Sequence, residues 1–243
     1  MDLRGRAALV TGGAVRLGRA MAVALAGRGM DVAFTYHASD AAAVEVEIAI
    51  RAAGVRALVL RCDQREEEQV RGAVERTRGE FDRLDVLVNS AAIFHRIAWE
   101  DVDAAAWDET LNTNLRGPFL FARHATPALK ASRGKIVNLA DIAGLRPWKE
   151  YLPYSVAKAG VIALTQGLAK ALAPEVQVNA IAPGAVLWPD EFTEAQRRQL
   201  LARIPLARAS SPDDVVNTLL YLLEGSDYVT GAVIPVDGGR ILW

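Results

Sequence analysis

Short apolar runs alternate with amphipathic segments along the whole chain. The apolar runs, typical of strands buried on both faces of a sheet, occur at residues 7–11, 31–36, 55–61, 84–88, 134–140, 176–182 and 232–236. The segments between them have helical spacing, and two of them end at Gly29 and Gly54. This alternation predicts an α/β, doubly wound Rossmann fold, in which helices cover both faces of a seven-stranded parallel sheet. Ligands of such sheets bind where the strands end.

Two longer stretches, residues 89–105 and 183–211, show no such pattern and are expected to be irregular. At the end of the second stretch, the letters SSPDD predict a new helix with Ser211 as its cap and Pro212 as its first residue. A mobile lid and simple packing are both compatible with residues 184–211. Because we find no repeat and no linker, residues 1–243 are expected to form one domain.

Composition and charge limit the kinds of ligand that the protein is expected to bind. The chain has 243 residues and a net charge of −1, so it carries no electrostatic signature of nucleic-acid or membrane binding, and we expect a small-molecule substrate. Cys62 is the single cysteine, and the N-terminus lacks the apolar stretch of a signal peptide, which together favour the cytoplasm. No run of 18 apolar residues occurs, and the three histidines lack metal-ligand spacing, so neither a membrane span nor a metal site is expected.

The first predicted strand runs into the letters VTGGAVRLGRA. Glycines at Gly12 and Gly18 allow a tight turn that brings the backbone close to a pyrophosphate at the start of the next helix, although an ordinary tight turn has the same glycines. Arg16 stands where the dinucleotide fingerprint has a glycine, and it is either a surface charge or a ligand for a second phosphate. Gly12, Arg16, Leu17 and Gly18 are the expected cofactor contacts of this turn.

The end of the second predicted strand indicates which nicotinamide cofactor binds. An acid at this place binds the ribose 2′-hydroxyl of NADH and repels a 2′-phosphate. Here His37 and Ser39 follow the strand, and no acid occurs before Asp40. We therefore expect NADPH, with His37 and Ser39 among its contacts.

Tyr154 and Lys158 lie four residues apart in a segment of helical character, so both side chains share one face. Bringing a phenol pKa of about 10 close to neutrality takes roughly 4 kcal/mol in favour of the anion, and a neighbouring ammonium can supply part of it. Tyr154 can then donate a proton near neutral pH. A surface pair on an amphipathic helix would have the same spacing.

Asp141 follows directly on the buried run KIVNLA. An ionised carboxylate at the edge of an apolar sheet costs free energy unless a partner is present. It is either a loop or helix-capping residue or part of a site.

These motifs together resemble the short-chain dehydrogenase/reductase family over essentially the whole chain. The matching segments are TGGAVRLG, NSAA at 89–92, LNTNL with Asn114, YSVAK, NAIAPG with Pro183 and Gly184, and VDGG at 236–239. The resemblance implies that Tyr154 is the acid/base, that Lys158 holds the nicotinamide ribose, and that Asn114 is structural and relays protons. It also implies cofactor contacts at Asn89, Ala91, Pro183 and Gly184, and a homotetramer. Asp63 is expected either to cap the following helix or to meet the adenine ring.

Asp141 lies thirteen residues before Tyr154, where the family has its catalytic serine. This substitution, Arg16 and the letters YHAS resemble the pteridine reductase branch, including dihydromonapterin reductases. Phe94 matches the aromatic residue that stacks on the pterin there, and Arg16, Asp141, Tyr154 and Trp188 complete the expected substrate contacts. Ala38 stands where well-known members of that branch have an arginine.

Reduction of a pterin C=N bond needs a proton at nitrogen, and a carboxyl that exchanges protons with Tyr154 suits this task. An ionised Asp141 would raise the pKa of Tyr154 and so oppose Lys158. The expected function is NADPH-dependent pterin reduction. The alternatives are a 3-oxoacyl thioester reductase, against which Asp141 speaks, and a cofactor-binding regulator without turnover.

Overall fold

The computed structural model describes residues 1–186 and 193–242, and within them seven strands form one parallel sheet. The strands are β1 (Ala7–Val10), β2 (Asp31–Tyr36), β3 (Ala57–Arg61), β4 (Val86–Asn89), β5 (Lys135–Leu139), β6 (Gln177–Pro183) and β7 (Val233–Val236). Each lies in one of the seven apolar runs or extends one residue beyond it, and the predicted doubly wound fold is confirmed.

Helices alternate with the strands along the described chain. The α-helices are α1 (Arg16–Gly27), α2 (Asp40–Ala52), α3 (Glu67–Phe81), α4 (Ala104–Leu111), α5 (Gly117–Ser132), α6 (Leu152–Leu172), α7 (Glu194–Leu201) and α8 (Pro212–Leu220). Shorter 3₁₀ turns are Trp99–Asp101, Ile142–Gly144, Lys149–Tyr151 and Arg240–Leu242, and π-helical turns are Asn112–Arg116 and Tyr221–Gly225.

The strand order is β3-β2-β1-β4-β5-β6-β7. The direction of winding reverses between β1 and β4, where Leu9 pairs with Leu87. Helices leave the sheet to opposite sides from this point, so the carboxyl ends of β1 and β4 border an open crevice, the usual ligand site of such sheets.

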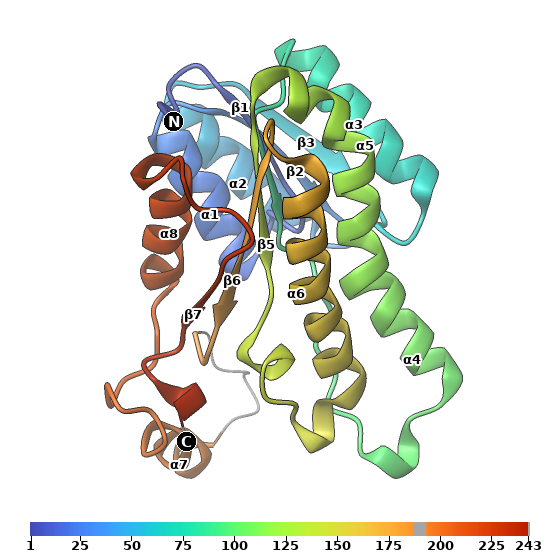
Figure 1. Ribbon diagram of the computed structural model, residues 1–243, viewed down its shortest axis with the longest axis vertical. Coiled ribbons are helices and arrows are strands. Elements are labelled where there is room, and N and C mark those ends of the chain that lie inside the picture. The colour runs from blue at the N-terminus through green and yellow to red at the C-terminus, as the bar shows by residue number, and fades with distance from the viewer. Residues whose placement is uncertain (187–192, 243) are drawn as a thin grey trace.

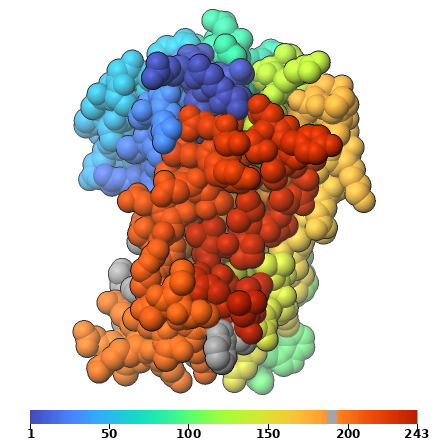
Figure 2. Space-filling model, turned by 60° about the vertical axis from the view of Figure 1, so that its left-hand side comes forward, coloured from blue at the N-terminus to red at the C-terminus, as the bar shows by residue number. Residues whose placement is uncertain are grey.

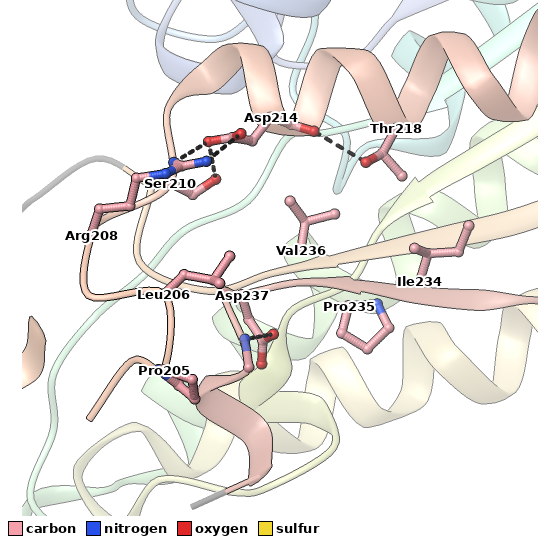
Figure 3. Close-up of a pocket in the computed structure, with 12 residues that line it drawn as sticks. Pro205, Leu206, Arg208, Ser210, Asp214, Thr218, Ile234, Pro235, Val236 and Asp237 are labelled. Carbon is pink, nitrogen blue, oxygen red and sulfur yellow. Dashed lines mark hydrogen bonds and ion pairs between the residues drawn. The ribbon is translucent and has the colours of Figure 1, made fainter. Parts of the chain in front are cut away.

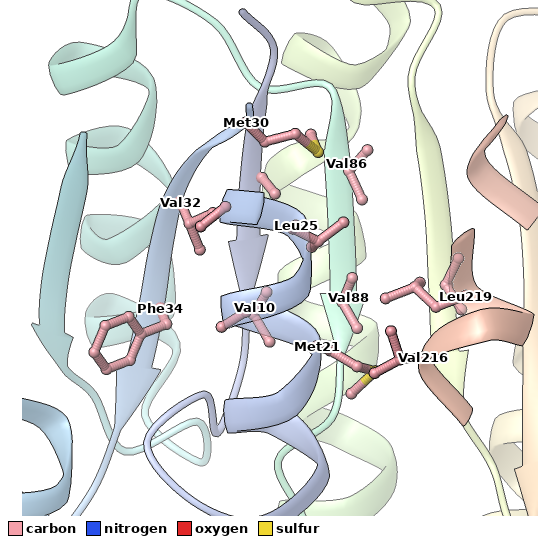
Figure 4. Packing of buried hydrophobic residues seen from close by; sticks show 14 of the residues in the cluster. Val10, Met21, Leu25, Met30, Val32, Phe34, Val86, Val88, Val216 and Leu219 are labelled. Carbon is pink, nitrogen blue, oxygen red and sulfur yellow. The ribbon is translucent and has the colours of Figure 1, made fainter. Parts of the chain in front are cut away.

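Alternate residues of the strands face two large cores, and a third, small cluster lies around Ala140, Val161 and Ala182. One core packs β1, β2 and β4 against α1, α2 and α8, with Met21, Leu25 and Leu219 fully buried (Figure 4). The other packs the opposite face of the sheet against α3, α5 and the end of α6, around Phe81 and Phe121 (Figure 1). Both faces are covered, which explains why the strands read as continuous apolar runs.

The last third of the chain differs in part from the prediction. Residues 183–211 are not irregular throughout, because α7 occurs within them and is stabilised by a capping box of Thr193 and Gln196. The predicted cap of α8 is confirmed: Ser211 accepts a hydrogen bond from the Asp214 backbone, and Pro212 is the first helical residue. Figure 2 shows this part of the chain, orange to red, spread over one side of the molecule.

None of the helices in the described parts of the chain is long and apolar enough to span a lipid bilayer.

Helix α2 offers a test of the two-core packing. Ile50 is fully buried against the sheet, whereas Ile48 on the same helix is 63% exposed. Ile50→Ala should lower the free energy of unfolding by about 2–5 kcal/mol, because it leaves a cavity. Ile48→Ala, the matched control, should change it by less than about 0.5 kcal/mol. Urea denaturation measures both, and equal effects would contradict the packing described.

Candidate functional site

The crevice between β1 and β4 is closed at its base by Thr11. The Thr11 hydroxyl accepts hydrogen bonds from the backbone N–H groups of Ser90 (2.9 Å) and Ala91 (3.0 Å). Gly12 has a φ of +64°, and a Cβ there would lie 2.7 Å from the Ala91 Cα. The positive φ and the close approach of Ala91 both exclude a side chain at Gly12. The turn therefore presents bare backbone at the N-terminus of α1.

Arg16 occupies a backbone conformation that favours glycine. Its φ is +51°, in the left-handed region, at the first residue of α1. Two residues later, a Cβ on Gly18 would come within 2.1 Å of the Gly12 carbonyl oxygen, so the turn also needs glycine there. Non-glycine residues held in this region occur preferentially at functional sites.

At the end of β2, the structure adds a cation that the sequence did not indicate. Arg61, the last residue of β3, donates a hydrogen bond to the His37 carbonyl oxygen (3.2 Å). Asp40, the nearest acid, accepts a hydrogen bond from the Tyr36 hydroxyl (3.0 Å). Ser39 is the N-terminal flanking residue of α2, but its side chain makes no capping hydrogen bond.

Asp63 does not cap α3, so that alternative is wrong. The residue at the cap position is Glu66, while the Asp63 carboxylate pairs with the Arg65 guanidinium (2.7 Å). This hydrogen-bonded pair lowers the pKa of Asp63. The expected contact of Asp63 with an adenine ring stays a prediction.

Asn89 is buried at the end of β4 and binds Asn138 of the neighbouring strand through its amide nitrogen (2.8 Å). The Oδ1 atom of Asn89 is buried without a hydrogen-bond partner among the described atoms. Next to it, the Gln64 side chain donates to the carbonyl oxygens of Ala91 (3.1 Å) and Thr113 (2.6 Å) and so holds the chain after β4. Sequence patterns gave no signal for Gln64.

Asp141 lies just after the carboxyl end of β5, beside Tyr154 in the first turn of α6. The Tyr154 hydroxyl donates a hydrogen bond to Asp141 Oδ2 (3.0 Å), and the other carboxylate oxygen accepts one from the Ala143 backbone (2.7 Å). Asp141 therefore caps the short turn Ile142–Gly144 and also contacts the phenol. The interpretation of Asp141 as a cap is confirmed, and its part in a site stays a prediction.

Lys158 lies below the tyrosine ring, with its Nζ 5.6 Å from the ring centroid. Its ammonium donates to the Leu139 carbonyl oxygen (2.6 Å), and its side chain is almost fully buried. Burial lowers the pKa of Lys158 to about 8.

The pKa of Tyr154 lies well above its usual value, because the phenol is buried and the Asp141 carboxylate is adjacent. Of the two opposing effects expected on the Tyr154 pKa, that of Asp141 prevails in this arrangement, in which the Lys158 ammonium points to a carbonyl oxygen rather than to the hydroxyl. Burial also raises the pKa of the Asp141 carboxyl, against the opposing effects of the Ala143 N–H and Lys158. Both shifts favour the protonated forms of the Tyr154 hydroxyl and the Asp141 carboxyl.

Asn114 clamps the backbone that carries Phe94. It is fully buried in the π-helical turn Asn112–Arg116, and its amide accepts from the Ile93 N–H and donates to the Ile93 carbonyl, both at 2.8 Å. Bulges of this kind are frequent at functional sites. The structure thus shows a positioning contact for Asn114.

Three aromatic side chains, Phe94, Trp148 and Tyr151, gather beside the Asp141–Tyr154 pair. Phe94, which is 43% exposed, stacks on Tyr151 (4.4 Å between ring centroids) and meets Tyr154 (4.8 Å) and Trp148 (6.4 Å) edge-on. Arg240 covers the Trp148 ring (4.9 Å). Tyr151, Trp148 and Arg240 were not among the predicted site residues, although Arg240 lies in the letters DGGRIL, which resemble the pteridine reductase branch.

Pro183 and Gly184 end β6 beside the C-terminal segment. The Gly184 N–H binds the Val236 carbonyl oxygen (3.0 Å), and a Cβ on Gly184 would lie 2.9 Å from the Asp237 Cα. Leu17, in the first turn of α1, packs partly buried against the first core. Trp188, an expected substrate contact, lies outside the described residues.

A cavity of about 490 Å³ lies between α8, β7 and the segment before α8, lined by Leu206, Arg208, Asp214 and Val236, among others (Figure 3). None of Asp141, Tyr154 and Lys158 lines it. A second cavity of about 190 Å³ is lined by Tyr151, Glu150 and α7 residues, next to the aromatic group. Asp141, Tyr154 and Lys158 therefore lie outside the larger cavity, and Tyr154 contacts the aromatic group.

Comparison with known proteins agrees with this arrangement. A family model described as enoyl-(acyl carrier protein) reductase matches residues 13–240. The 3-oxoacyl-[acyl-carrier-protein] reductase FabG of Staphylococcus aureus is 35% identical over 242 residues, which cover 98% of each chain.

Two solved structures are also similar. A blue fluorescent protein from a metagenomic library, in complex with NADPH, has a TM-score of 0.93 and 31% identity over 99% of each chain. A short-chain dehydrogenase from Burkholderia cenocepacia, in complex with NADP, has a TM-score of 0.93 and 32% identity over 99% of each chain. The chain belongs to the short-chain dehydrogenase/reductase family. It is accordingly a short-chain oxidoreductase.

The left-handed backbone at Arg16 can be tested by substitution. Arg16→Gly and Arg19→Gly remove the same side chain from α1, but only the first relieves a positive φ. The free energy of unfolding of Arg16→Gly should exceed that of Arg19→Gly by about 1–2 kcal/mol, since left-handed backbone is unfavourable for arginine and glycine is unfavourable inside a helix. Denaturant titration measures the difference, and the reverse order would contradict the strain at Arg16.

Proposed function

We propose that this protein is an NADPH-dependent reductase of a pterin or a closely related reduced heterocycle. The observation that carries the proposal is the hydrogen bond between Tyr154 and Asp141, a carboxyl where the family has a serine. The whole of residues 1–243 would act as one unit, because the expected cofactor and substrate contacts come from both halves of the same sheet.

The residues around the crevice suit a dinucleotide phosphate. The bare turn at Gly12 lies at the N-terminus of α1 and fits a pyrophosphate, and the buried, unpartnered Oδ1 of Asn89 is available to a bound group. Arg61 supplies positive charge beside His37, near Ser39, where a 2′-phosphate would lie, and Arg16 lies at the first residue of α1, next to the turn that would hold the phosphates. Asp40 is already engaged by Tyr36. The NADPH bound in one similar structure and the NADP bound in the other are in accord with this assignment.

NADPH, when bound, supplies a hydride to a carbon of the substrate. The nitrogen of the reduced C=N bond then needs one proton, so that the substrate gains a hydride and a proton and the cofactor leaves as NADP⁺. Tyr154 holds a proton on its hydroxyl, and Asp141 Oδ2, 3.0 Å away, is placed to replace it. The raised pKa of Asp141 favours this exchange. Lys158 orients the pair from below and would hold the nicotinamide ribose.

The aromatic group favours a flat substrate. Phe94 exposes nearly half of its surface next to Tyr154, and Asn114 fixes the backbone before it. A planar heterocycle stacked against Phe94 would bring its reacting bond towards the Tyr154 hydroxyl. Pterin stacking on Phe94 is the role implied by the resemblance to pteridine reductases.

A 3-oxoacyl thioester is the second candidate substrate. It is favoured by the comparisons, because the curated relative reported above is named a 3-oxoacyl-[acyl-carrier-protein] reductase. The names support this candidate better than a pterin. Asp141 is the residue that opposes it, because it stands where the family has its catalytic serine.

One assay separates the two candidates. NADPH oxidation is followed with dihydrobiopterin, dihydromonapterin and acetoacetyl-CoA, using wild type, Asp141→Ser and Asp141→Asn. We expect turnover of the dihydropterins by wild type and a fall of about 100-fold or more in both variants, the size of effect typical of a lost acid/base group.

Both variants can still accept the Ala143 N–H, so the local turn should remain, and circular dichroism checks this. If wild type reduces acetoacetyl-CoA alone, and Asp141→Ser retains or increases that rate, the second candidate is correct. Tight NADPH binding without oxidation of any substrate would indicate the regulator instead.

The cofactor preference has a separate test. Arg61→Gln removes the cation beside His37. The KM for NADPH should rise about 10-fold while that for NADH stays the same, because only NADPH carries a 2′-phosphate. Arg78→Gln, an exposed arginine at the far end of α3, is the control. Equal changes for both cofactors would exclude Arg61 from 2′-phosphate binding.

The family resemblance also suggests a homotetramer. Light scattering of the purified protein measures its mass directly.

A further inference from the structure

Asp237 holds the C-terminal turn that carries Arg240. The buried Asp237 carboxylate accepts hydrogen bonds from the N–H groups of Gly239 (2.9 Å) and Ile241 (2.7 Å). Gly238 and Gly239 both have positive φ, and a Cβ on Gly238 would lie 2.7 Å from an Ile204 side-chain carbon. Arg240 is therefore the first long side chain after a turn that is held from both sides.

Arg240 reaches the same aromatic group that borders Tyr154. Its guanidinium lies 4.9 Å from the Trp148 ring, and Trp148 meets Phe94 at 6.4 Å. The Trp148 backbone is itself tied to Ser155 of α6 (3.1 Å), one residue after Tyr154. A chain of contacts thus connects Arg240 with the reactive pair.

The Arg240 guanidinium has unused hydrogen-bonding capacity. It is partly buried, and across residues 1–186 and 193–242 no hydrogen bond or ion pair of its side chain is found. Burial lowers the pKa of Arg240, Asp141 and Asp237 act in the opposite direction, and Arg203 adds like-charge repulsion. Asp141 is already bound by Ala143 and Tyr154, and Asp237 by its own turn.

We propose that Arg240 is a substrate-binding residue that selects substrates with an anionic group, a carboxylate or a phosphate, at the edge of the Phe94–Trp148 group. A guanidinium with free N–H groups binds such oxyanions through two parallel hydrogen bonds. Arg203 increases the local positive charge. This inference rests on the proposed function, because it places the reacting part of the substrate between Phe94 and Tyr154.

The test uses pairs of substrates that share a reacting group and differ in charge. Dihydrofolate carries glutamate carboxylates, whereas the side chain of dihydrobiopterin is uncharged. Acetoacetyl-CoA carries phosphates, whereas acetoacetyl-N-acetylcysteamine is uncharged. Arg240→Gln should raise the KM of the anionic member about 10-fold or more and that of the neutral member less than about 3-fold. Arg240→Lys, which keeps the charge without the planar fork, should recover part of the loss.

The two pairs also distinguish a carboxylate from a phosphate as the bound group. Arg78→Gln is the control and should alter neither pair. If Arg240 merely braces Trp148, Arg240→Gln should lower the melting temperature and raise both KM values alike, and that result would overturn the proposal, as would no change in either pair.

Failure of the proposed function gives a different result from failure of this inference. If none of the four compounds is reduced, the proposed function fails, and binding is then measured by tryptophan fluorescence with folate, biopterin and the two thioesters in the presence of NADP⁺. Preferential binding of the anionic members, lost in Arg240→Gln, would support the role of Arg240. Equal or absent binding of all four compounds would overturn it.

Discussion

The hydrogen bond from the Tyr154 phenol to the Asp141 carboxylate is the interaction around which the rest of the site is arranged. It joins the start of α6 to the carboxyl end of β5. Burial raises the pKa of both the phenol and the carboxyl, and the buried ammonium of Lys158 lies beneath the tyrosine ring. In a low-dielectric setting these groups titrate together, so the protonation of one changes that of the others. A serine at position 141 would offer a hydroxyl but would add no titrating group to this system.

The fold makes this arrangement stable by anchoring each member to regular structure. Asp141 is fixed by the turn that it caps, Lys158 by a strand carbonyl oxygen, and Phe94 by the clamp between Asn114 and Ile93. The two apolar cores hold these elements from opposite faces of the sheet. The positions of Asp141, Tyr154 and Lys158 therefore do not depend on the residues that line the larger cavity.

Charge is distributed unevenly around the site although the chain as a whole is nearly neutral. Arg16 lies at the start of α1, Arg61 at the end of β3 beside His37, and Arg240 against the Trp148 ring of the aromatic group. Such local cations favour phosphate and carboxylate ligands even where the net charge gives no such indication.

Periodicity and motif spacing are enough to predict the seven strands, the cap of α8 and the pairing of Tyr154 with Lys158, because each depends on residues close together in the chain. The position of Asp141 thirteen residues before Tyr154 also identified the acid correctly as a neighbour of the phenol. The direction of the Tyr154 pKa, the position of Arg61 next to His37 and the approach of Arg240 to Trp148 depend on burial and on contacts between distant segments. They appear only in the folded chain, since burial and long-range charge are properties of packing rather than of local sequence.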